Sequence, residues 1–160
     1  MDVKRSKIPK DGIRVAGKPE DVIFIGWFDE TMEKAHTFFA DKNDIPLYQS
    51  RQANASISSK KKILFIEHHP DAERENELYK SIGLKNPEVW PSMDEAIFKS
   101  FGGERILGLM KQLGMQEEEA IEHKMISNSI KTAQKKIAKK IISDNYAFSQ
   151  EEWMRKNLKI

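Results

Sequence analysis

The chain has 160 residues, 39% of them hydrophobic, which is enough for one buried core and disfavours two large independent domains. Its 27 Lys and Arg residues nearly balance 25 Asp and Glu residues, and this net charge of +2 argues against a dedicated nucleic-acid binder or a strongly electrostatic membrane binder. The absence of cysteine excludes disulfides and cysteine nucleophiles, and no run approaches the roughly 18 apolar residues of a membrane span, so we expect a cytoplasmic protein.

Residues 1–20 are basic and contain two prolines and two glycines, a composition that disfavours helix. We expect this segment to be a flexible arm ahead of the folded part.

Residues 21–100 carry an alternation of strand and helix signals. Short apolar runs predict strands at Val22–Trp27, Ile45–Tyr48, Ile63–Ile66 and Val89–Trp90. A helix is expected after the first run, with Asp29 at its N-cap, and another between Pro70–Asp71 and Gly83. The pattern predicts an α/β lobe with a small, mostly parallel sheet in three layers.

Residues 101–160 and the stretch just before them are predicted to be helical. Helices are expected to start near Ser92 and near Ser149, each followed by a glutamate at capping-box spacing. Between them lie a short helix over Ile106–Leu113 and a longer one whose apolar stripe runs from Ile126 to Ile141. We expect this helical segment to pack on the lobe.

The segment Phe101–Ile137 reads FGGERILGLMKQLGMQEEEAIEHKMISNSIKTAQKKI. An aromatic-Gly turn, an Arg, Leu-Gly-Met, Glu-Ala-Ile-Glu-His and Ser-Ile-x-x-Ala-Gln-x-Lys follow one another in it. In this order the motifs resemble a segment of SecA, the preprotein-translocase motor. In SecA, this segment joins the end of the second nucleotide-binding lobe to the start of the helical scaffold. The likeness is weaker over VWPSMDEAIFKSFGG and ILFIEHH upstream, and only architectural in the first 60 residues. The resemblance implies a truncated or divergent SecA relative whose lobe is half of a RecA-like ATPase unit.

The sequence differs from SecA in the motifs that bind and hydrolyse ATP. SecA motors hydrolyse ATP between two lobes, but this chain has no G-x-x-x-x-G-K-[ST] loop to surround phosphates. Where the arginine-finger motif should lie, the chain has Asn76–Gly83, an ordinary helix end. We therefore expect no ATPase activity from the chain alone, no catalytic residues and no cofactor.

Glu67, His68 and His69 form the one cluster with ligand-binding chemistry in the sequence. Adjacent residues at a strand end point in opposite directions, so the two histidines are not expected to share a metal ion. The alternative is a strand terminus with hydrogen-bonded imidazoles. Because open α/β sheets bind ligands at the carboxyl ends of their strands, Glu67 and His68 remain the first candidates for a cofactor or enzyme site.

Candidate partner-binding residues lie in the helical segment. Arg105 belongs to the stretch that resembles SecA, and Trp153 either docks on the body or offers a surface to a partner. Lys131, Lys135 and Lys139 lie on the polar side of the long helix, which is either a solvated face or a contact surface for acidic groups.

The leading hypothesis is a non-catalytic SecA-like interaction module that associates with a protein partner, with the preprotein-translocation machinery among the candidates. The alternative is one part of a divergent SecA-like ATPase whose glycine-loop lobe is on another chain, in which case ATP would be the cofactor. A third hypothesis is a small α/β enzyme that uses Glu67 and His68. None of them requires specific nucleic-acid binding or a membrane span, although all are compatible with peripheral membrane association.

Overall fold

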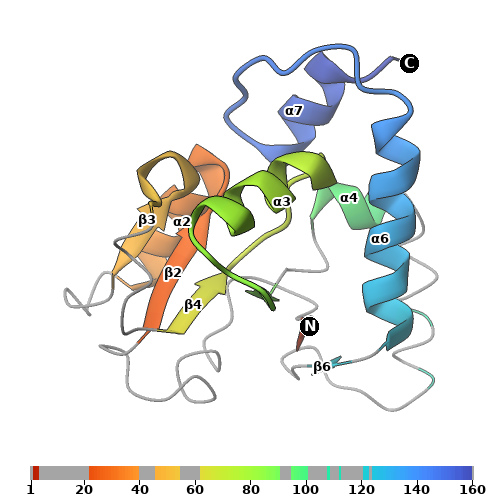
Figure 1. The fold of residues 1–160 in the computed structure, drawn as a ribbon. Coiled ribbons are helices and arrows are strands. Elements are labelled where there is room, and N and C mark those ends of the chain that lie inside the picture. Colours follow the sequence, from red (N-terminus) through yellow and green to blue (C-terminus); the bar gives the residue numbers. More distant parts are fainter. Residues whose placement is uncertain are drawn as a thin grey trace.

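The computed structural model describes residues 2–3, 22–39, 46–54, 62–90, 95–100, 108, 112, 121–122 and 124–159. A four-stranded sheet consists of β2 (Val22–Gly26), β3 (Leu47–Gln49), β4 (Lys62–Phe65) and β5 (Glu88–Val89). In Figure 1, the labelled strands of this sheet lie on one side of the molecule and α6 on the other. The order across the sheet is β3-β2-β4-β5, and every neighbouring pair is parallel. The predicted α/β fold with a mostly parallel sheet is confirmed.

The two central strands are apolar on both faces, which is why each reads as a continuous hydrophobic run. Along β2, Val22 and Phe24 join one buried cluster, whereas Ile23 and Ile25 join another on the opposite face. β4 alternates in the same way, as side chains of a strand must. Both faces of the sheet therefore need a cover of helices.

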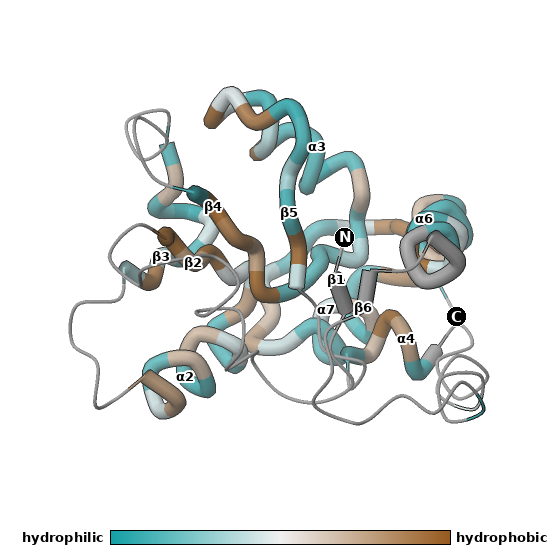
Figure 2. Tube along the Cα trace, turned by 90° about the horizontal axis from the view of Figure 1, so that it is seen from below, coloured by the Kyte–Doolittle hydropathy of each residue, from teal (hydrophilic) through white to brown (hydrophobic). Residues whose placement is uncertain are grey.

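The helices supply this cover in two layers. α2 (Asp29–Phe38) packs on the first face, where Ala35 lies in the same cluster as Val22 and Phe24. α3 (Ala72–Ser81) packs on the other face, with the ring of Tyr79 5.0 Å from that of Phe65. Figure 2 shows hydrophobic colour along β2 and β4 and hydrophilic colour over much of α3 and α6. Sheet and helices thus form three layers.

The predicted boundaries of α3 are confirmed at both ends. At the start, the Asp71 carboxylate accepts a hydrogen bond from the Glu73 N–H at 3.0 Å. At the end, Gly83 has φ +75°, and the N–H groups of Gly83 and Leu84 donate to the carbonyls of Lys80 and Tyr79 at 3.2 and 2.8 Å. This pair of bonds is a Schellman motif, which requires the left-handed backbone that glycine adopts readily.

The C-terminal helices share the core of the lobe. α4 (Ala96–Ser100) contacts both α6 (Lys124–Ala138) and α7 (Gln150–Asn157), and α6 also contacts α3. Ile130 and Ile137 of α6 and Trp153 of α7 lie in the same buried cluster as Ile25 of the central strand. The lobe and the helical segment therefore bury one common core, although the predicted boundary at residue 100 remains a prediction.

The long helix ends earlier than its apolar stripe suggests. α6 stops at Ala138, and Ile141 lies beyond it in an antiparallel bridge with Leu158. The N–H of Ile142 donates to the Asn157 carbonyl at 2.8 Å, and the N–H of Lys159 donates to the Lys140 carbonyl at 2.7 Å. We call this pairing of residues 140–142 with 157–159 the C-terminal clasp. Its backbone hydrogen bonds take the place of those that a longer α6 would form here.

The expectation that residues 101–160 are helical throughout is therefore wrong after Ala138, and it is also wrong before α6. β6 (Ile121–Glu122) pairs antiparallel with β1 (Asp2–Val3), directly before α6. A two-residue pairing over such a sequence distance leaves no periodic signal in the local sequence.

Other predictions lie partly or wholly outside the described residues. These include the arm over residues 1–20, of which only Asp2 and Val3 are described and form β1 instead of a flexible segment. They also include Ser92, Arg105 and the helix over Ile106–Leu113, of which Gly108 and Gln112 are described and helical. Within the described part of the chain, no helix combines the length and apolar character needed to cross a membrane.

Candidate functional site

The carboxyl ends of β2 and β4 meet at the middle of the sheet, where the chain order reverses between β3-β2 and β4-β5. Ligands of open α/β folds bind at this position. The loop that follows β4 brings Glu67, His68 and His69 there, each with less than a tenth of its surface exposed. The structure therefore places the predicted candidates Glu67 and His68 at the expected edge of the sheet.

The side chain of Glu67 caps the N-terminus of α2. The N-cap position is Phe28 rather than the predicted Asp29, and its side chain offers no acceptor. The Glu67 Oε2 atom accepts hydrogen bonds from the N–H groups of Trp27 and Phe28 at 2.8 and 3.0 Å, and Oε1 accepts from the Thr31 hydroxyl at 2.7 Å. Burial raises the pKa of Glu67 to about 7, although these donors favour the charged form.

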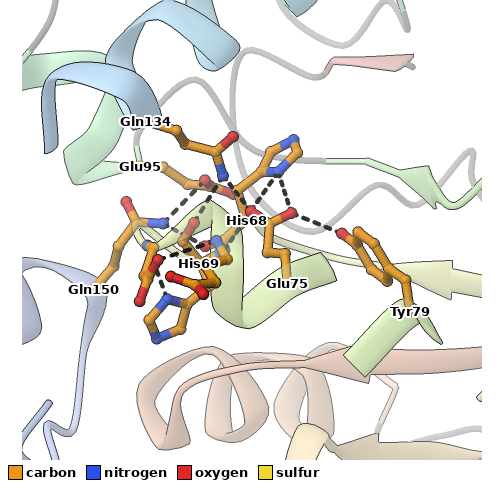
Figure 3. Close-up of polar contacts among 9 residues, drawn as sticks. His68, His69, Glu75, Tyr79, Glu95, Gln134 and Gln150 are labelled. Carbon is orange, nitrogen blue, oxygen red and sulfur yellow. Dashed lines mark hydrogen bonds and ion pairs between the residues drawn. The ribbon is translucent and has the colours of Figure 1, made fainter. Parts of the chain in front are cut away.

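His68 points toward Glu75 of α3 (Figure 3). Its Nδ1 lies 3.1 Å from both carboxylate oxygens of Glu75, and Glu75 also accepts from the Tyr79 hydroxyl at 2.7 Å. Burial opposes ionisation of Glu75, but the neighbouring His68 and the donated hydrogen bonds outweigh it and lower the pKa of Glu75. The result is a buried carboxylate held in its charged form by partners of its own chain.

His69 is enclosed by aromatic rings. Its ring centroid lies 5.4 Å from that of Phe28, 5.2 Å from Trp27 and 4.9 Å from Trp153. Nδ1 accepts a hydrogen bond from the Asp71 N–H at 3.0 Å. Burial lowers the pKa of His69 to about 4, so this imidazole is neutral at physiological pH.

Two glutamines from the C-terminal helices hold the loop. The Gln134 amide of α6 donates to the His69 carbonyl at 2.9 Å and also to Glu75. The Gln150 amide of α7 donates to the His68 carbonyl at 2.8 Å and to Glu95 at 3.2 Å, while its oxygen accepts from the Ile97 N–H at 2.8 Å. Figure 3 shows both glutamines converging on the loop.

Sequence reasoning missed Glu75, Tyr79, Gln134 and Gln150. One signal was available for Gln134, because it is a polar residue between Ala133 and Ile137 on the apolar stripe of α6, where a buried amide needs a partner. Gln150 and Glu75 lie in first helical turns, where polar residues are common and carry no such signal.

At this edge of the sheet, the polar groups that a ligand could bind are already hydrogen-bonded to other residues of the chain. Beyond the carboxylate of Glu67, the Glu30 N–H of α2 donates to the Phe148 carbonyl at 2.9 Å, and the Tyr146 hydroxyl donates to Asp29. Among the described residues, no three His, Asp or Glu side chains converge as metal ligands. Within this part of the chain, the arrangement is that of a packed junction between β2, β4, α2 and the C-terminal segment.

The predicted partner-binding residues fall in different environments. Lys131 and Lys135 of α6, and Lys139 directly after its end, are exposed, as a contact surface requires. Trp153 is 2% exposed and donates to Asp144 at 3.1 Å, so it belongs to the core and offers no surface to a partner. Arg105 is outside the described residues.

The sequence of the chain is similar to that of proteins from one family. No protein-family model matches the chain. The chain is 35% identical over 79 residues to a protein translocase subunit SecA of Alkaliphilus oremlandii, covering 47% of this chain and 9% of that protein. It is 30% identical over 129 residues to SecA of Acinetobacter baylyi, covering 77% and 14%. For SecA of Clostridium beijerinckii the identity is 38% over 80 residues, covering 48% and 9%.

The chain therefore spans only about a tenth of the length of these relatives. The comparisons show a SecA-related sequence, either a fragment or a divergent form.

Proposed function

We propose that this SecA-related chain is a non-catalytic interaction module that associates with a protein partner in preprotein translocation. Two observations support the proposal: the similarity to SecA at 28–38% identity, and a sheet edge that is filled by the chain's own polar groups. We propose a cytoplasmic location, with peripheral contact to the membrane through the partner.

The occupied start of α2 is the observation that carries the non-catalytic part of the proposal. Phosphate groups bind at helix N-termini because free N–H groups point toward them. Here the N–H groups of Trp27 and Phe28 donate to Glu67, and that of Glu30 donates to Phe148. A phosphate at this position would compete with a carboxylate already bonded there and, in its charged form, would be repelled by it.

A second candidate function is one part of a divergent SecA-like ATPase whose glycine-loop lobe is on another chain. The parallel sheet with helices on both faces suits such a lobe, and the match to a tenth of SecA leaves the rest of a motor to be supplied elsewhere. In this case an ATP site would form only when the second lobe is added.

ATP binding and turnover by the purified chain provide the first test. Fluorescent ATP should show no saturable binding to the chain alone, and ATP turnover should equal that of buffer. Saturable binding or turnover by the chain alone would overturn the non-catalytic assignment. Turnover that arises only on mixing with a glycine-loop lobe, and in neither part alone, would establish the second candidate.

Association with purified full-length SecA tests the partner. Sedimentation or interferometry should show a saturable complex, whereas a SecA-unrelated protein of similar charge serves as the control. Failure of the chain to bind SecA or any purified component of preprotein translocation would refute the interaction proposal.

A further inference from the structure

A row of exposed lysines lies on the outer side of α6 and continues into the turn that follows it. Its inner side is buried, with Ile130, Ala133 and Ile137 between 0% and 4% exposed in the core. None of the lysines on the outer side forms an ion pair with another described residue. We call these residues the basic stripe: Lys131, Lys135, Lys136, Lys139 and Lys140.

The C-terminal clasp adds a further lysine, Lys159, at the end of the basic stripe. Its hydrogen bond from the Lys159 N–H to the Lys140 carbonyl, at 2.7 Å, brings another exposed lysine beside the last lysine of the stripe. Ile142, next in this pairing, is 65% exposed. An exposed apolar side chain thus lies at the end of a row of cations.

Several positive charges on neighbouring elements have an acidic partner. On α7, Glu152 lies 3.0 Å from the Lys156 ammonium and 3.9 Å from the Arg155 guanidinium, and on α3 Arg74 pairs with Asp144. The stripe and the clasp instead present six exposed lysines without an ion pair to another described residue, in a chain whose total charge is only +2.

We propose that the basic stripe and Ile142 bind an acidic segment of a protein, with an apolar side chain of that segment packed on Ile142. The inference deepens the proposed function, on which it rests, by naming the surface and the chemistry of the partner. Opposite charges along both surfaces would set the register of the complex and speed its formation.

The chemistry of this surface favours a protein partner over a nucleic acid or a membrane. Lysine is a point charge without the bidentate fork by which arginine holds phosphate groups, and the basic stripe contains no arginine or aromatic residue. A helix that lies in a membrane surface inserts its apolar face, but the apolar face of α6 is already buried in the core.

Fluorescence anisotropy with a labelled peptide of glutamate pairs separated by single leucines tests the proposal. Lys135, Lys139 and Lys140 are replaced together by glutamine. The matched control replaces Lys34, Lys80 and Lys85, which are also exposed but lie on other parts of the chain; of these, Lys34 pairs with Glu30 at 3.6 Å. Both variants lose the same net charge. Both should keep the circular dichroism and thermal midpoint of the wild type, because only exposed side chains change.

The stripe variant should bind the peptide ~10-fold more weakly, and the control less than ~3-fold more weakly, as expected for the loss of three exposed charge contacts. Ile142→Ser should weaken binding of this peptide but leave binding of its leucine-to-serine analogue unchanged. Equal losses in the stripe and control variants would overturn the proposal. So would tighter binding to single-stranded DNA or to phosphatidylglycerol vesicles than to the peptide.

The same variants separate this inference from the proposed function. If the wild type and both variants bind SecA equally, the association stands and the assigned surface is wrong. If SecA does not bind while the peptide distinguishes the stripe variant from the control, the surface stands and the proposed partner is wrong.

Discussion

Glu67 belongs in sequence to the end of β4 but in space to the start of α2. Its carboxylate satisfies two backbone N–H groups and one hydroxyl that α2 itself leaves without an intrahelical partner. Because the pKa of Glu67 is raised from 4.5 to about 7, the folded protein binds this proton more tightly than the unfolded chain does.

Glu67→Gln is expected to change how stability depends on pH. The stabilising contribution of proton binding at Glu67 is complete below pH 4.5 and is lost as the pH rises through about 7. The advantage of the wild type over the variant should therefore shrink by up to ~3 kcal/mol between pH 5 and 8. Urea unfolding at a series of pH values measures the difference.

The matched control for Glu67 is Glu77→Gln, on the exposed side of α3. Its unfolding free energy should stay within ~0.5 kcal/mol of the wild type at every pH. A constant difference between wild type and Glu67→Gln across this range would contradict the raised pKa.

The sequence predicted the position of Glu67 and His68 but not their partners. A polar residue directly after a buried strand must lie at the carboxyl edge of the sheet, whatever surrounds it. The partners Glu75, Gln134 and Gln150 come from three helices, and which of their side chains reach the loop depends on helix packing that periodicity does not specify.

At the scale of elements, α3 is specified locally at both ends. Gly83→Ala should cost ~1 kcal/mol, because an added Cβ meets nothing within 4 Å and the loss comes from the left-handed backbone alone. Gly83→Asn should cost less, since asparagine tolerates this conformation. Thermal unfolding of the two variants decides the matter, and equal losses would point to something other than backbone conformation.

α6 depends on a distant contact rather than on its ends. Gln134→Leu removes the amide that donates to the buried Glu75 carboxylate and to the His69 carbonyl, and should cost ~1–3 kcal/mol in unfolding free energy. Urea unfolding measures this loss. Lys135→Ala, one residue further along and exposed, should change stability by less than ~0.5 kcal/mol; comparable losses in both variants would mean that the buried amide contributes nothing specific.

Elements formed by short-range rules were the ones that the sequence could predict. The strand runs, the Asp71 cap and the Gly83 terminator depend on neighbouring residues, and all appear within two residues of the expected positions. The end of α6 and strand β6 depend on backbone pairing with residues far along the chain. No local pattern distinguishes Ile141 as a bridge residue from Ile141 as a helical one.

For the whole molecule, the shared core predicts one cooperative unit. Trp153→Ala removes a side chain that is 2% exposed and should cost ~3–5 kcal/mol. Because Trp153 and Ile25 belong to one cluster, amide hydrogen exchange should accelerate in β2 as well as in α6 and α7.

Ile142→Ala, at a position 65% exposed, is the control and should leave exchange in β2 unchanged. Unaltered protection of β2 in the Trp153 variant would mean that the lobe folds independently of the helical segment, as a domain boundary at residue 100 would allow.

The C-terminal clasp also bears on how the molecule would respond to mechanical force. Tension applied at Lys159 would load the bond to Lys140 first and the bond between Asn157 and Ile142 next, so that the clasp unzips one bond at a time. The parallel strands β2 and β4, pulled along their length, would instead share the load over several bonds at once. The C-terminal clasp would therefore open at a lower force than the sheet, so that mechanical resistance differs between these two parts of the molecule.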